Sequence, residues 1–465
     1  MNHSNTPFCS LSHLLLAPRD NHVVAFQGDE CIHWPQFVQD VSDYTHHLKR
    51  LPQHNIALCA RDSYWFAVGF FALCHSDKSI VLPGNYQPQA LAELSPHFDL
   101  VLHDRELDAV ADCPNLELGM AMQPAPQVDF APLELETTSV TLFTSGSSGV
   151  PKAIRKTLRQ LDVEVSILQS LWGEALTGCR IEATVSHQHI YGLLFRLLWP
   201  LSAARPFARH NLEFPEQVSA HAGDDVALIS SPALLKRLSE EHQAKALRLA
   251  FSSGGPLPHA AAAHANDLFG SLPVEVFGST ETGGIAHRQQ VTPQTPWQLF
   301  PRVQATLNQE NCLRLCSAHV DPEGWYQTAD ECEFVDERRF VLKGRTDRII
   351  KVEEKRVSLV EVEKRAEQLS VIEECAVIPA VIPATEGNRT VLLAAIVLTE
   401  QGKQQVETLG KGKFWLQLRN ELRQWLEPIA VPRRFRIVPE IPLNSQGKRQ
   451  NTEIERLFHA TPISD

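Results

Sequence analysis

Long hydrophobic runs and a basic surplus are both missing from this 465-residue chain. No stretch reaches the roughly 20 consecutive apolar residues that a membrane helix requires. The N-terminal segment has only a four-residue apolar run, Leu14 to Ala17, and no basic cluster before it, so we expect no secretory signal. Lys and Arg total 43 against 55 Asp and Glu, a formal charge of -12. We therefore expect a cytoplasmic protein with no membrane span and no nucleic-acid partner.

Paired cysteines and internal repeats are also missing. The ten cysteines are scattered, and no two have the C-x-x-C spacing. Cys312 and Cys316 are the closest pair, and no two further ligands stand at the spacing that a zinc site needs. We therefore expect reduced, mostly buried thiols. No fixed-period repeat or low-complexity tract interrupts the chain, which excludes solenoid and fibrous classes.

The chain is too long for one ordinary hydrophobic core, so two or more domains are expected. The first part alternates short β-rich runs with helical patterns, which is typical of parallel α/β layers. We predict strands at 55–60, 79–83 and 138–144, and helices at 65–74, 89–94 and 158–172. From about Lys351 the texture changes to that of a smaller α+β domain. There we predict helices at 360–369 and 414–426, with strands at 375–379 and 391–399.

The strongest single motif is a loop rich in glycine and hydroxyl residues. It follows the predicted strand 138–144 and reads Thr144-Ser145-Gly146-Ser147-Ser148-Gly149-Val150-Pro151-Lys152. Its backbone N–H groups and hydroxyls are suited to surround a polyphosphate, and Lys152 adds a point charge. It is not a Walker A loop, because only two residues separate the glycines and Pro151 precedes the lysine. Taken alone, the same composition also fits a surface linker.

This loop resembles the phosphate loop of the adenylate-forming superfamily, which includes acyl-CoA synthetases, aryl-CoA ligases, luciferases and peptide-synthetase adenylation domains. The resemblance implies that residues 144–149 and Lys152 bind the phosphates of ATP. Phe277-Gly278-Ser279-Thr280-Glu281 resembles the family's aromatic-Gly-x-Thr-Glu motif. By this likeness Phe277 and Gly278 contact the nucleotide, Thr280 contacts the α-phosphate, and Glu281 binds Mg²⁺. A single carboxylate is sufficient when phosphates and water complete the shell of a hard cation.

Two further motifs resemble the ribose and hinge elements of the family. Gly324 to Asp330 resembles Gly-Trp-aromatic-x-Thr-Gly-Asp, with Ala329 where the family has Gly. The likeness assigns Asp330 to the ribose hydroxyls. Gly344-Arg345-Thr346-Asp347 resembles the segment that ends the large domain, so Arg345 is expected at the ribose and Asp347 at the hinge. A helix-capping role for Asp347 is compatible with that duty.

Near the C-terminus, Pro442 to Lys448 resembles the family's Pro-x-Thr-x-x-Gly-Lys motif. Lys448 is then expected to bridge the attacking carboxylate and the α-phosphate, where a positioned ammonium stabilises developing negative charge. His189-Ile-Tyr-Gly192 resembles the element whose histidine lies beside the substrate carboxylate. His187 stands two residues earlier, and the sequence leaves open which ring faces the site. Gly254 and Gly255, in a Ser-Gly-Gly-Pro-Leu turn, are expected where substrate and adenine approach the backbone.

The resemblance extends over five ordered motifs from Thr144 to Lys448 and implies a fold. It is an α/β architecture, with a large N-terminal AMP-binding domain (1–345) that includes a β-barrel portion and a small mobile α+β domain (346–465). The implied activity is ATP- and Mg²⁺-dependent formation of an acyl-adenylate from a small carboxylic acid, either an aryl or an acyl acid. The small domain then rotates about Asp347, and the acyl group passes to a phosphopantetheine thiol.

One departure bears on the thiol acceptor. Glu354 stands where many family members have Gly, at the strand that lines the pantetheine tunnel. With the chain's modest length, this favours an acyl carrier protein as acceptor, as in the similar stand-alone ligases of aryl-polyene pathways. A ligase that uses free CoA is the alternative. An amino-acid-activating domain is a third hypothesis, since Glu216, Asp224 and Asp225 offer acids without a clear placement. A non-catalytic nucleotide binder is disfavoured, because Glu281 and Lys448 are both present.

Overall fold

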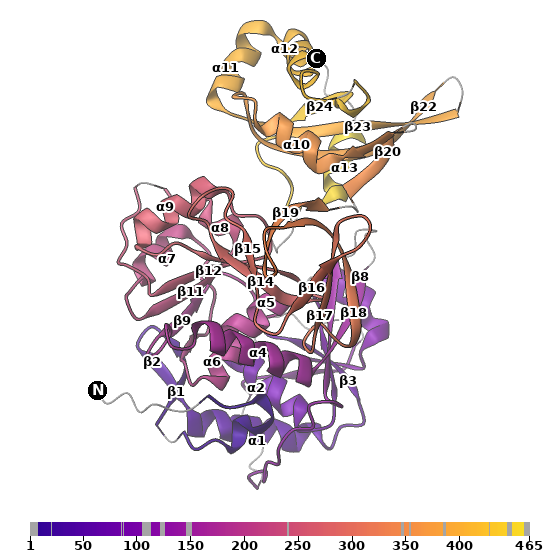
Figure 1. Ribbon diagram of the computed structural model, residues 1–465. Helices are drawn as coiled ribbons and strands as arrows, with labels where there is room; N and C mark the ends of the chain where they lie inside the picture. Colours follow the sequence, from indigo (N-terminus) through magenta and orange to yellow (C-terminus); the bar gives the residue numbers. More distant parts are fainter. Residues whose placement is uncertain are drawn as a thin grey trace. The chain divides into compact units, whose positions relative to one another are not determined.

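The structure is a computed structural model of the whole chain, shown in Figure 1. It describes residues 8–19, 21–84, 86, 88–104, 113–120, 126–145, 151–239, 241–345, 348–352, 355–384, 387–426, 428–443 and 449–459. The chain divides into two compact units. Unit 1 comprises Met1–Ala305, Leu315–Tyr326 and Asp336–Arg339, and unit 2 comprises Thr306–Arg314, Gln327–Val335 and Phe340–Asp465. The domain boundary predicted at 345/346 stays a prediction.

One sheet of unit 1 carries the glycine-rich loop between its last two strands. Its strands run in the order β6-β5-β3-β4-β7-β8. All neighbouring pairs are parallel except β7 and β8, which are antiparallel. The strands are β3 (Asn55–Cys59), β4 (Ser79–Leu82), β5 (Leu100–His103), β6 (Asn115–Glu117), β7 (Ser139–Ser145) and β8 (Pro151–Thr157). The helices that accompany them are α1 (Trp34–Leu48), α2 (Ser63–Cys74) and α3 (Pro88–Leu94). Helix α2 is apolar on all sides because it packs against both α1 and the sheet.

A second sheet of unit 1 runs in the order β2-β1-β10-β9-β11-β12-β13-β14-β15. Its middle strands, from β1 to β13, are parallel, and β2, β14 and β15 are antiparallel to their neighbours. The strands are β1 (Val23–Gln27), β2 (Glu30–His33), β9 (Arg180–Ala183), β10 (Phe207–Ala208), β11 (Val226–Ser230), β12 (Leu249–Ser252), β13 (Val274–Ser279), β14 (Gly283–Gln289) and β15 (Trp297–Leu299).

Helices cover both faces of this second sheet (Figure 1). On β12, Ala250 packs in the core formed with α7, α8 and α9, while the next residue, Phe251, joins an aromatic cluster with Trp172 and Phe195 on the opposite face. This alternation is what two-sided burial of a strand requires. The helical segments are η1 (Leu11–Leu16), α4 (Leu158–Trp172), α5 (Ile190–Gly192), η3 (Leu193–Leu198), α6 (Trp199–Ser202), α7 (Pro215–His221), α8 (Pro232–Leu235) and α9 (His259–Phe269).

Unit 2 begins with parts of four strands that are neighbours in the order β16-β17-β18-β19. It continues with a hairpin of β20 and β21, and then with a sheet in the order β22-β23-β24. The strands are β16 (Gln304–Leu307), β17 (Cys312–Ser317), β18 (Asp321–Phe334), β19 (Arg339–Arg345), β20 (Ile349–Val352), β21 (Lys355–Ser358), β22 (Ile372–Ala384), β23 (Gly387–Leu398) and β24 (Arg434–Ile437).

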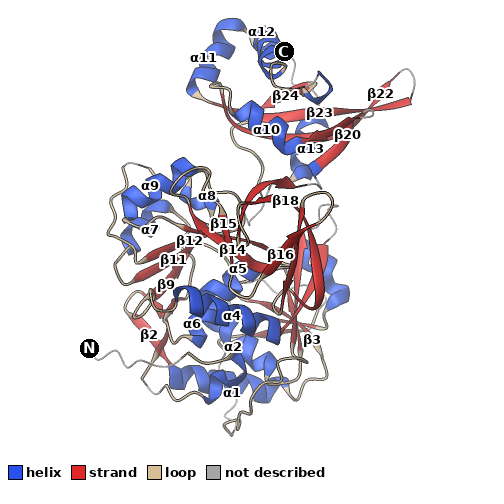
Figure 2. Ribbon diagram, viewed as in Figure 1, coloured by secondary structure: helices blue, strands red, loops and turns tan. Residues whose placement is uncertain are grey.

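Figure 2 shows the helices that flank the β22-β23-β24 sheet. They are α10 (Leu359–Glu367), α11 (Glu400–Leu409), α12 (Lys411–Leu422) and α13 (Asn451–His459). One face of the sheet packs against α10 and α12, and the other face packs against α13. The mixed α/β fold with a smaller C-terminal part confirms the fold class expected from the sequence. Among the helices that the structure describes, none is long and apolar enough to cross a membrane.

Candidate active site

The glycine-rich motif begins and ends on two paired strands of unit 1. Thr144 on β7 is the register partner of Lys152 on β8, and the next pair is Ser145 with Pro151. The antiparallel pairing therefore holds the two ends of the loop together. Thr144 is half-buried and Lys152 is exposed. Gly146, Ser147, Ser148 and Gly149 lie outside the described residues, so their contacts with phosphate stay a prediction.

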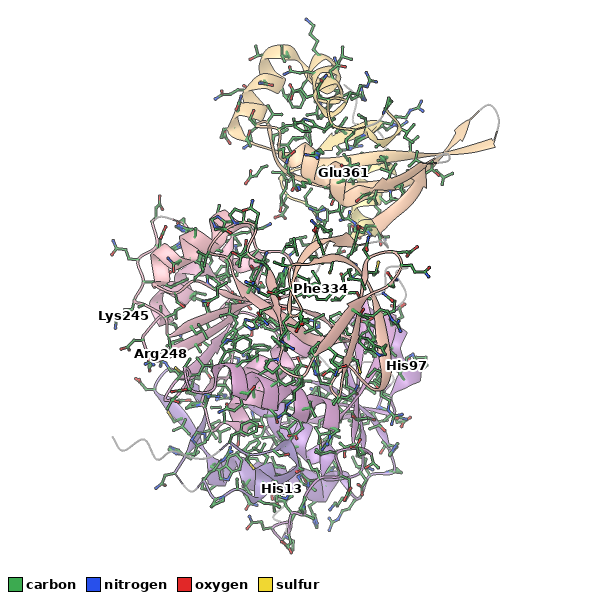
Figure 3. The ribbon with its side chains drawn as sticks, viewed as in Figure 1. His13, His97, Lys245, Arg248, Phe334 and Glu361 are labelled. Carbon is green, nitrogen blue, oxygen red and sulfur yellow. The ribbon has the colours of Figure 1, made fainter. Side chains whose placement is uncertain are left out.

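Aromatic packing supports the strand that leads into this loop. The ring of His97, labelled in Figure 3, lies 4.9 Å from that of Phe143, measured between centroids. Phe143 itself is buried beside Leu142. The residue before Thr144 is therefore packed in the core, which supports the start of the loop.

The Thr-Glu motif lies in a tight hairpin between β13 and β14. Gly278 pairs with Gly284 so closely that a Cβ on Gly278 would stand 2.0 Å from the carbonyl oxygen of Gly283. Across the turn, Ser279 and Thr282 exchange backbone-to-hydroxyl hydrogen bonds of 3.0 and 3.2 Å. These bonds close the turn and leave Thr280 and Glu281 half-exposed at its tip.

An ion pair joins the two hairpins. Lys152 Nζ donates a hydrogen bond of 2.9 Å to Glu281 Oε1, and the two side chains are 58% and 25% exposed. Burial acts to raise the pKa of Glu281, but hydrogen bonds from Lys152, from its own backbone and from Ser279 outweigh it and hold that pKa below its usual value. The same contact raises the pKa of Lys152. The predicted phosphate-binding cation and the predicted metal ligand are thus in direct contact.

The donors at this place fit a magnesium ion bound to a nucleotide. Glu281 is ionised, partly accessible, and already accepts a hydrogen bond from a cationic group. A hard divalent ion takes oxygen ligands, and phosphates and water complete its shell. Among the residues that the structure describes, no group of three or more His, Cys, Asp or Glu is arranged around a possible metal position. The donors around Glu281 fit the ion, and Glu281 as its ligand stays a prediction.

The Ser-Gly-Gly-Pro-Leu turn is tied to the strand that leads to the Thr-Glu hairpin. Ser253 Oγ donates to the carbonyl oxygen of Val276 at 2.8 Å, and the Leu257 N–H donates to Glu275 at 3.4 Å. A Cβ on Gly255 would meet no described heavy atom within 4 Å, so this stretch of backbone borders open space. Close approach of a ligand to Gly254 and Gly255 stays a prediction, as does the contact of a nucleotide with Phe277 and Gly278.

Family models match both parts of the chain. A model of AMP-binding enzymes matches residues 76–314, and a model of the AMP-binding enzyme C-terminal domain matches residues 361–448. The chain belongs to the AMP-binding enzyme family. The resemblance read from the motifs is thereby confirmed at the level of the family.

Relatives of this AMP-binding enzyme include ligases with different acceptors. A 4-coumarate–CoA ligase of Halorhodospira halophila is 26% identical over 323 residues, which is 68% of this chain and 75% of the relative. A D-alanine–D-alanyl carrier protein ligase of Staphylococcus haemolyticus is 27% identical over 160 residues, 34% of this chain and 29% of the relative. The structure of the anthranilate CoA ligase AuaEII with anthranoyl-AMP has a TM-score of 0.75 at 18% identity, covering 98% of both chains. That structural likeness shows the fold.

The two histidines of the AMP-binding enzyme have different surroundings. His187 is 2% exposed; its Nε2 bonds the Ala60 carbonyl oxygen at 2.7 Å and its Nδ1 lies 3.0 Å from Ser63 Oγ. A carbonyl oxygen only accepts, so Nε2 carries the proton and Nδ1 accepts from the serine. Burial lowers the pKa of His187 well below its usual value. Both ring nitrogens are used inside the protein, so His187 is a core residue.

His189 has the more open position of the two. It is half-buried and lies beside Gly84, where an ideal Cβ would stand 3.8 Å from His189 Cε1 and 2.7 Å from the Phe143 carbonyl oxygen. This places the ring close to the end of β7, next to the start of the glycine-rich loop. The choice that the sequence left open therefore falls on His189, while its contact with a substrate carboxylate stays a prediction.

In unit 2, the two predicted ribose contacts are neighbours. Asp330 on β18 is the register partner of Arg345 on β19, and Arg345 Nη1 donates to Asp330 Oδ1 at 3.1 Å. The Asp330 backbone N–H donates to Thr328 Oγ1 at 3.1 Å, and this hydrogen bond holds the main chain of Asp330 in place. The pair is consistent with one binding position, and its contact with ribose stays a prediction.

The remaining predicted residues of unit 2 lie outside the described residues. They are the hinge Asp347, the strand residue Glu354 and Lys448. The residues on either side of 444–448 are described, and Leu443 and Arg449 form an isolated antiparallel bridge there. Arg449 also contacts the carboxylate of Glu363 on α10 at 2.8 Å. The base of the segment that contains Lys448 is therefore anchored to unit 2.

Sequence reasoning missed the residues that lie beneath the Thr-Glu turn. Gly283 has φ +67°, and a Cβ there would stand 2.1 Å from Glu164 Oε2. Glu164 is 2% exposed and accepts the Gly284 N–H at 2.6 Å. Two signals were present: a Gly-Gly pair directly after the motif, and a glutamate at helical spacing from the buried Leu161 and Leu168. An acid on the core face of a helix needs a buried partner.

Proposed function

We propose that this AMP-binding enzyme activates a carboxylic acid with ATP and transfers the acyl group to a thiol. The single observation that carries the proposal is the Lys152–Glu281 ion pair, which brings a loop suited to phosphate and a carboxylate suited to Mg²⁺ to the same point. Membership of the AMP-binding enzyme family supports it. The cytoplasmic location expected from the sequence is kept as part of this proposal.

In the first step, a carboxylate oxygen of the acid attacks the α-phosphorus of ATP. The bond from that phosphorus to the bridging oxygen breaks, and pyrophosphate leaves with both electrons of the bond. Residues 144–149 and Lys152 hold the leaving phosphates, Thr280 holds the α-phosphate, and His189 lies near the acid's carboxylate. When bound through Glu281, Mg²⁺ neutralises phosphate charge. The protein contributes mainly position and charge stabilisation.

In the second step, the sulfur of a pantetheine thiol attacks the acyl carbon. The bond from that carbon to the phosphate oxygen breaks, AMP leaves, and the thiol proton passes to water. Rotation of the C-terminal part about Asp347 would withdraw Lys448 and admit the thiol, which is a gating motion between two arrangements. Asp330 and Arg345 would keep the ribose of AMP in place through both steps.

We assign an acyl carrier protein as the favoured acceptor, with an aromatic acid as the first substrate class to test. Glu354 supports the first choice, because it departs from the glycine that many family members have at the strand lining the pantetheine tunnel. The alternative is an aryl- or fatty-acyl-CoA ligase, and the relatives include ligases of both acceptor types. Offering CoA and phosphopantetheinylated carrier protein together after adenylation separates the two. Glu354→Gly should raise the share of acyl-CoA if that residue excludes CoA.

The experiment that tests the activity itself is a pyrophosphate-release screen over benzoates, cinnamates, fatty acids and amino acids. We expect release that depends on ATP, on Mg²⁺ and on one of these acids. Release by amino acids alone would instead identify an amino-acid-activating domain. If the folded protein bound ATP but no acid in a wide screen produced pyrophosphate, the assignment as an acid-activating ligase would be wrong.

A further inference from the structure

Three buried ionisable side chains meet beneath the turn that presents Glu281. Lys156 comes from β8, Glu164 from α4, and His319 from the segment between β17 and β18, and they are 2%, 2% and 0% exposed. Burying charged groups is costly unless each has partners. Nothing in the reaction proposed above uses these three residues, so their place under the turn calls for another role.

Lys156 holds the main chain of the predicted metal ligand. Its Nζ donates a short hydrogen bond to the carbonyl oxygen of Glu281 and a second one, of 3.2 Å, to the carbonyl oxygen of His319. Glu281 therefore contacts two lysines in different ways. Lys152 contacts the partly exposed carboxylate of Glu281, where a metal ion could replace it. Lys156 instead binds the main chain of Glu281 from inside the protein.

Glu164 and His319 hold the other end of the same turn. Glu164 Oε1 accepts the Gly284 N–H at 2.6 Å, and His319 Nε2 bonds the Gly284 carbonyl oxygen at 2.8 Å. Because a carbonyl only accepts, Nε2 carries the proton, and Nδ1 accepts from Ser317 Oγ at 2.8 Å. The histidine is thus neutral, in agreement with burial that lowers its pKa to about 4. Both backbone groups of Gly284 are fixed by side chains.

We propose that Lys156 is a positioning residue for the metal ligand: it sets the height and direction of Glu281 through its carbonyl, while Glu164 and His319 clamp the turn at Gly284. This inference rests on the function proposed above, in which Glu281 binds Mg²⁺. Hydrogen bonds from outside the immediate shell of a metal orient its ligands, and losing one typically weakens metal affinity or activity by about 10- to 100-fold. We expect Lys156 to act by orienting Glu281. In the described hydrogen bonds of Lys156, the amino group donates only to main-chain carbonyl oxygens.

The test measures ATP affinity by calorimetry, with EDTA and with MgCl₂, in the absence of any acid. The variant is Lys156→Met combined with Glu164→Gln. Removing both charges avoids an unpaired buried carboxylate, and glutamine still offers an oxygen to the Gly284 N–H. We expect unchanged affinity in EDTA and a loss of about tenfold in the strengthening by Mg²⁺. Arg155→Met is the matched control, since Arg155 is the exposed neighbour on β8, and it should keep the full Mg²⁺ effect.

Two further measurements separate positioning from general stability. Glu281→Gln should lose the same Mg²⁺ effect, and adding it to the double variant should cause no further loss, since both act on one contact. Amide hydrogen exchange should be faster at residues 280–284 of the double variant and unchanged on β12. Lys156→Met alone is expected to be less stable than the double variant, because it leaves Glu164 without its nearest buried cation.

The outcomes are distinguishable. If the double variant keeps the full Mg²⁺ effect or its 280–284 amides exchange as in the wild type, Lys156 does not position Glu281 and the inference is wrong. If the wild-type protein binds ATP equally in EDTA and in MgCl₂, the failure lies in the proposed role of Glu281 instead. For a variant that does not unfold cooperatively, hydrogen exchange is the only measurement used. A loss of amide protection spread evenly over unit 1 would then contradict a role confined to the turn.

Discussion

Each unit of this protein contains a buried glutamate on the first helix after a loop of the proposed site. Glu164 on α4 follows the glycine-rich hairpin, and Glu363 on α10 follows the β20–β21 hairpin. Glu164 accepts the Gly284 N–H, and the charge of Lys156 acts on it from nearby. Glu363 accepts hydrogen bonds from Nη1 and Nη2 of Arg348 and from the Val377 N–H, and it forms an ion pair with Arg449.

The difference teaches how each unit holds its reactive segment. In unit 1 the buried acid binds the backbone of a turn, so the turn's shape is fixed while its exposed side chains stay available. In unit 2 the buried acid ties together two arginines, each of which directly follows a predicted functional residue, Asp347 or Lys448. Arg348 and Arg449, which follow the predicted hinge and the predicted tail lysine in the sequence, thus share one carboxylate.

The largest effect is expected where that carboxylate is removed. Glu363→Ala leaves two arginines without their shared partner, and breaking a buried pair in this way typically costs about 3–5 kcal/mol of unfolding free energy. Chemical denaturation followed by hydrogen exchange on β22 and α10 would measure it. Glu367→Ala is the control, since Glu367 lies 3.7 Å from Arg449 and should cost less. Equal losses of unfolding free energy in both variants would show that the contacts of Glu363 contribute no more than those of Glu367.

A large effect on chemistry, without one on binding, is expected from Lys448→Ala. The lysine is predicted to stabilise charge that develops at the α-phosphate, and removing such a contact typically lowers the rate by about a hundredfold or more. ATP binding, which we assign mainly to unit 1, should persist in calorimetry. Acid-dependent exchange of pyrophosphate into ATP measures the rate. Exchange at the wild-type level would remove Lys448 from the mechanism.

A pH-dependent effect is expected from Glu164→Gln. Burial raises the pKa of Glu164 from 4.5 to about 7, so its protonated form favours the folded state. That contribution is complete below about pH 4.5 and is lost as the pH rises towards 7. The stability advantage of the wild type over Glu164→Gln should therefore shrink between pH 5 and 7.5, by at most about 1.4 kcal/mol per pH unit. Urea denaturation across this range tests the sign, and a widening gap would mean that Glu164 is ionised in the fold.

The smallest change in stability is expected from Lys152→Met. Its ion pair with Glu281 is partly exposed, and pairs near the surface contribute about 0–1 kcal/mol. The affinity for ATP should nevertheless fall, because the lysine is predicted to bind phosphate. Thermal unfolding and calorimetry on the same variant compare the two. A loss of stability similar to that of Glu363→Ala would erase the distinction drawn between the units.

The local pattern was sufficient for many elements of the fold. Helix α4 occupies 158–172 as its apolar spacing predicted, and β3, β4 and β7 begin within one residue of their predicted positions. The helix predicted at 414–426 is displaced towards the N-terminus, since α12 spans Lys411–Leu422. Leu426 is nevertheless buried in the same core cluster as Phe414 and Leu422. The apolar spacing therefore predicted the burial of Leu426 correctly, although the helix ends before it.

The site residues were predicted from motifs, but the buried residues that hold them in place were not. The contacts between Lys152 and Glu281 and between Asp330 and Arg345 join residues that the motifs had named. Lys156 and His319 belong to no motif, and the two carbonyl groups that Lys156 bonds lie 125 and 163 residues from it along the chain. The periodicity of a sequence predicts which face of an element is buried, but it does not predict which distant backbone group that face contacts. Only coordinates supply that information.

The two bonds of Lys156 also set an order of assembly. The Glu281 turn takes its final support only when β8, the β13–β14 hairpin and the segment around His319 have all been made. During synthesis, which proceeds from the N-terminus, the glycine-rich hairpin therefore emerges long before the group that completes its neighbourhood. A nascent chain that ends before residue 319 contains the glycine-rich and Thr-Glu motifs and still lacks the carbonyl of His319 that Lys156 bonds.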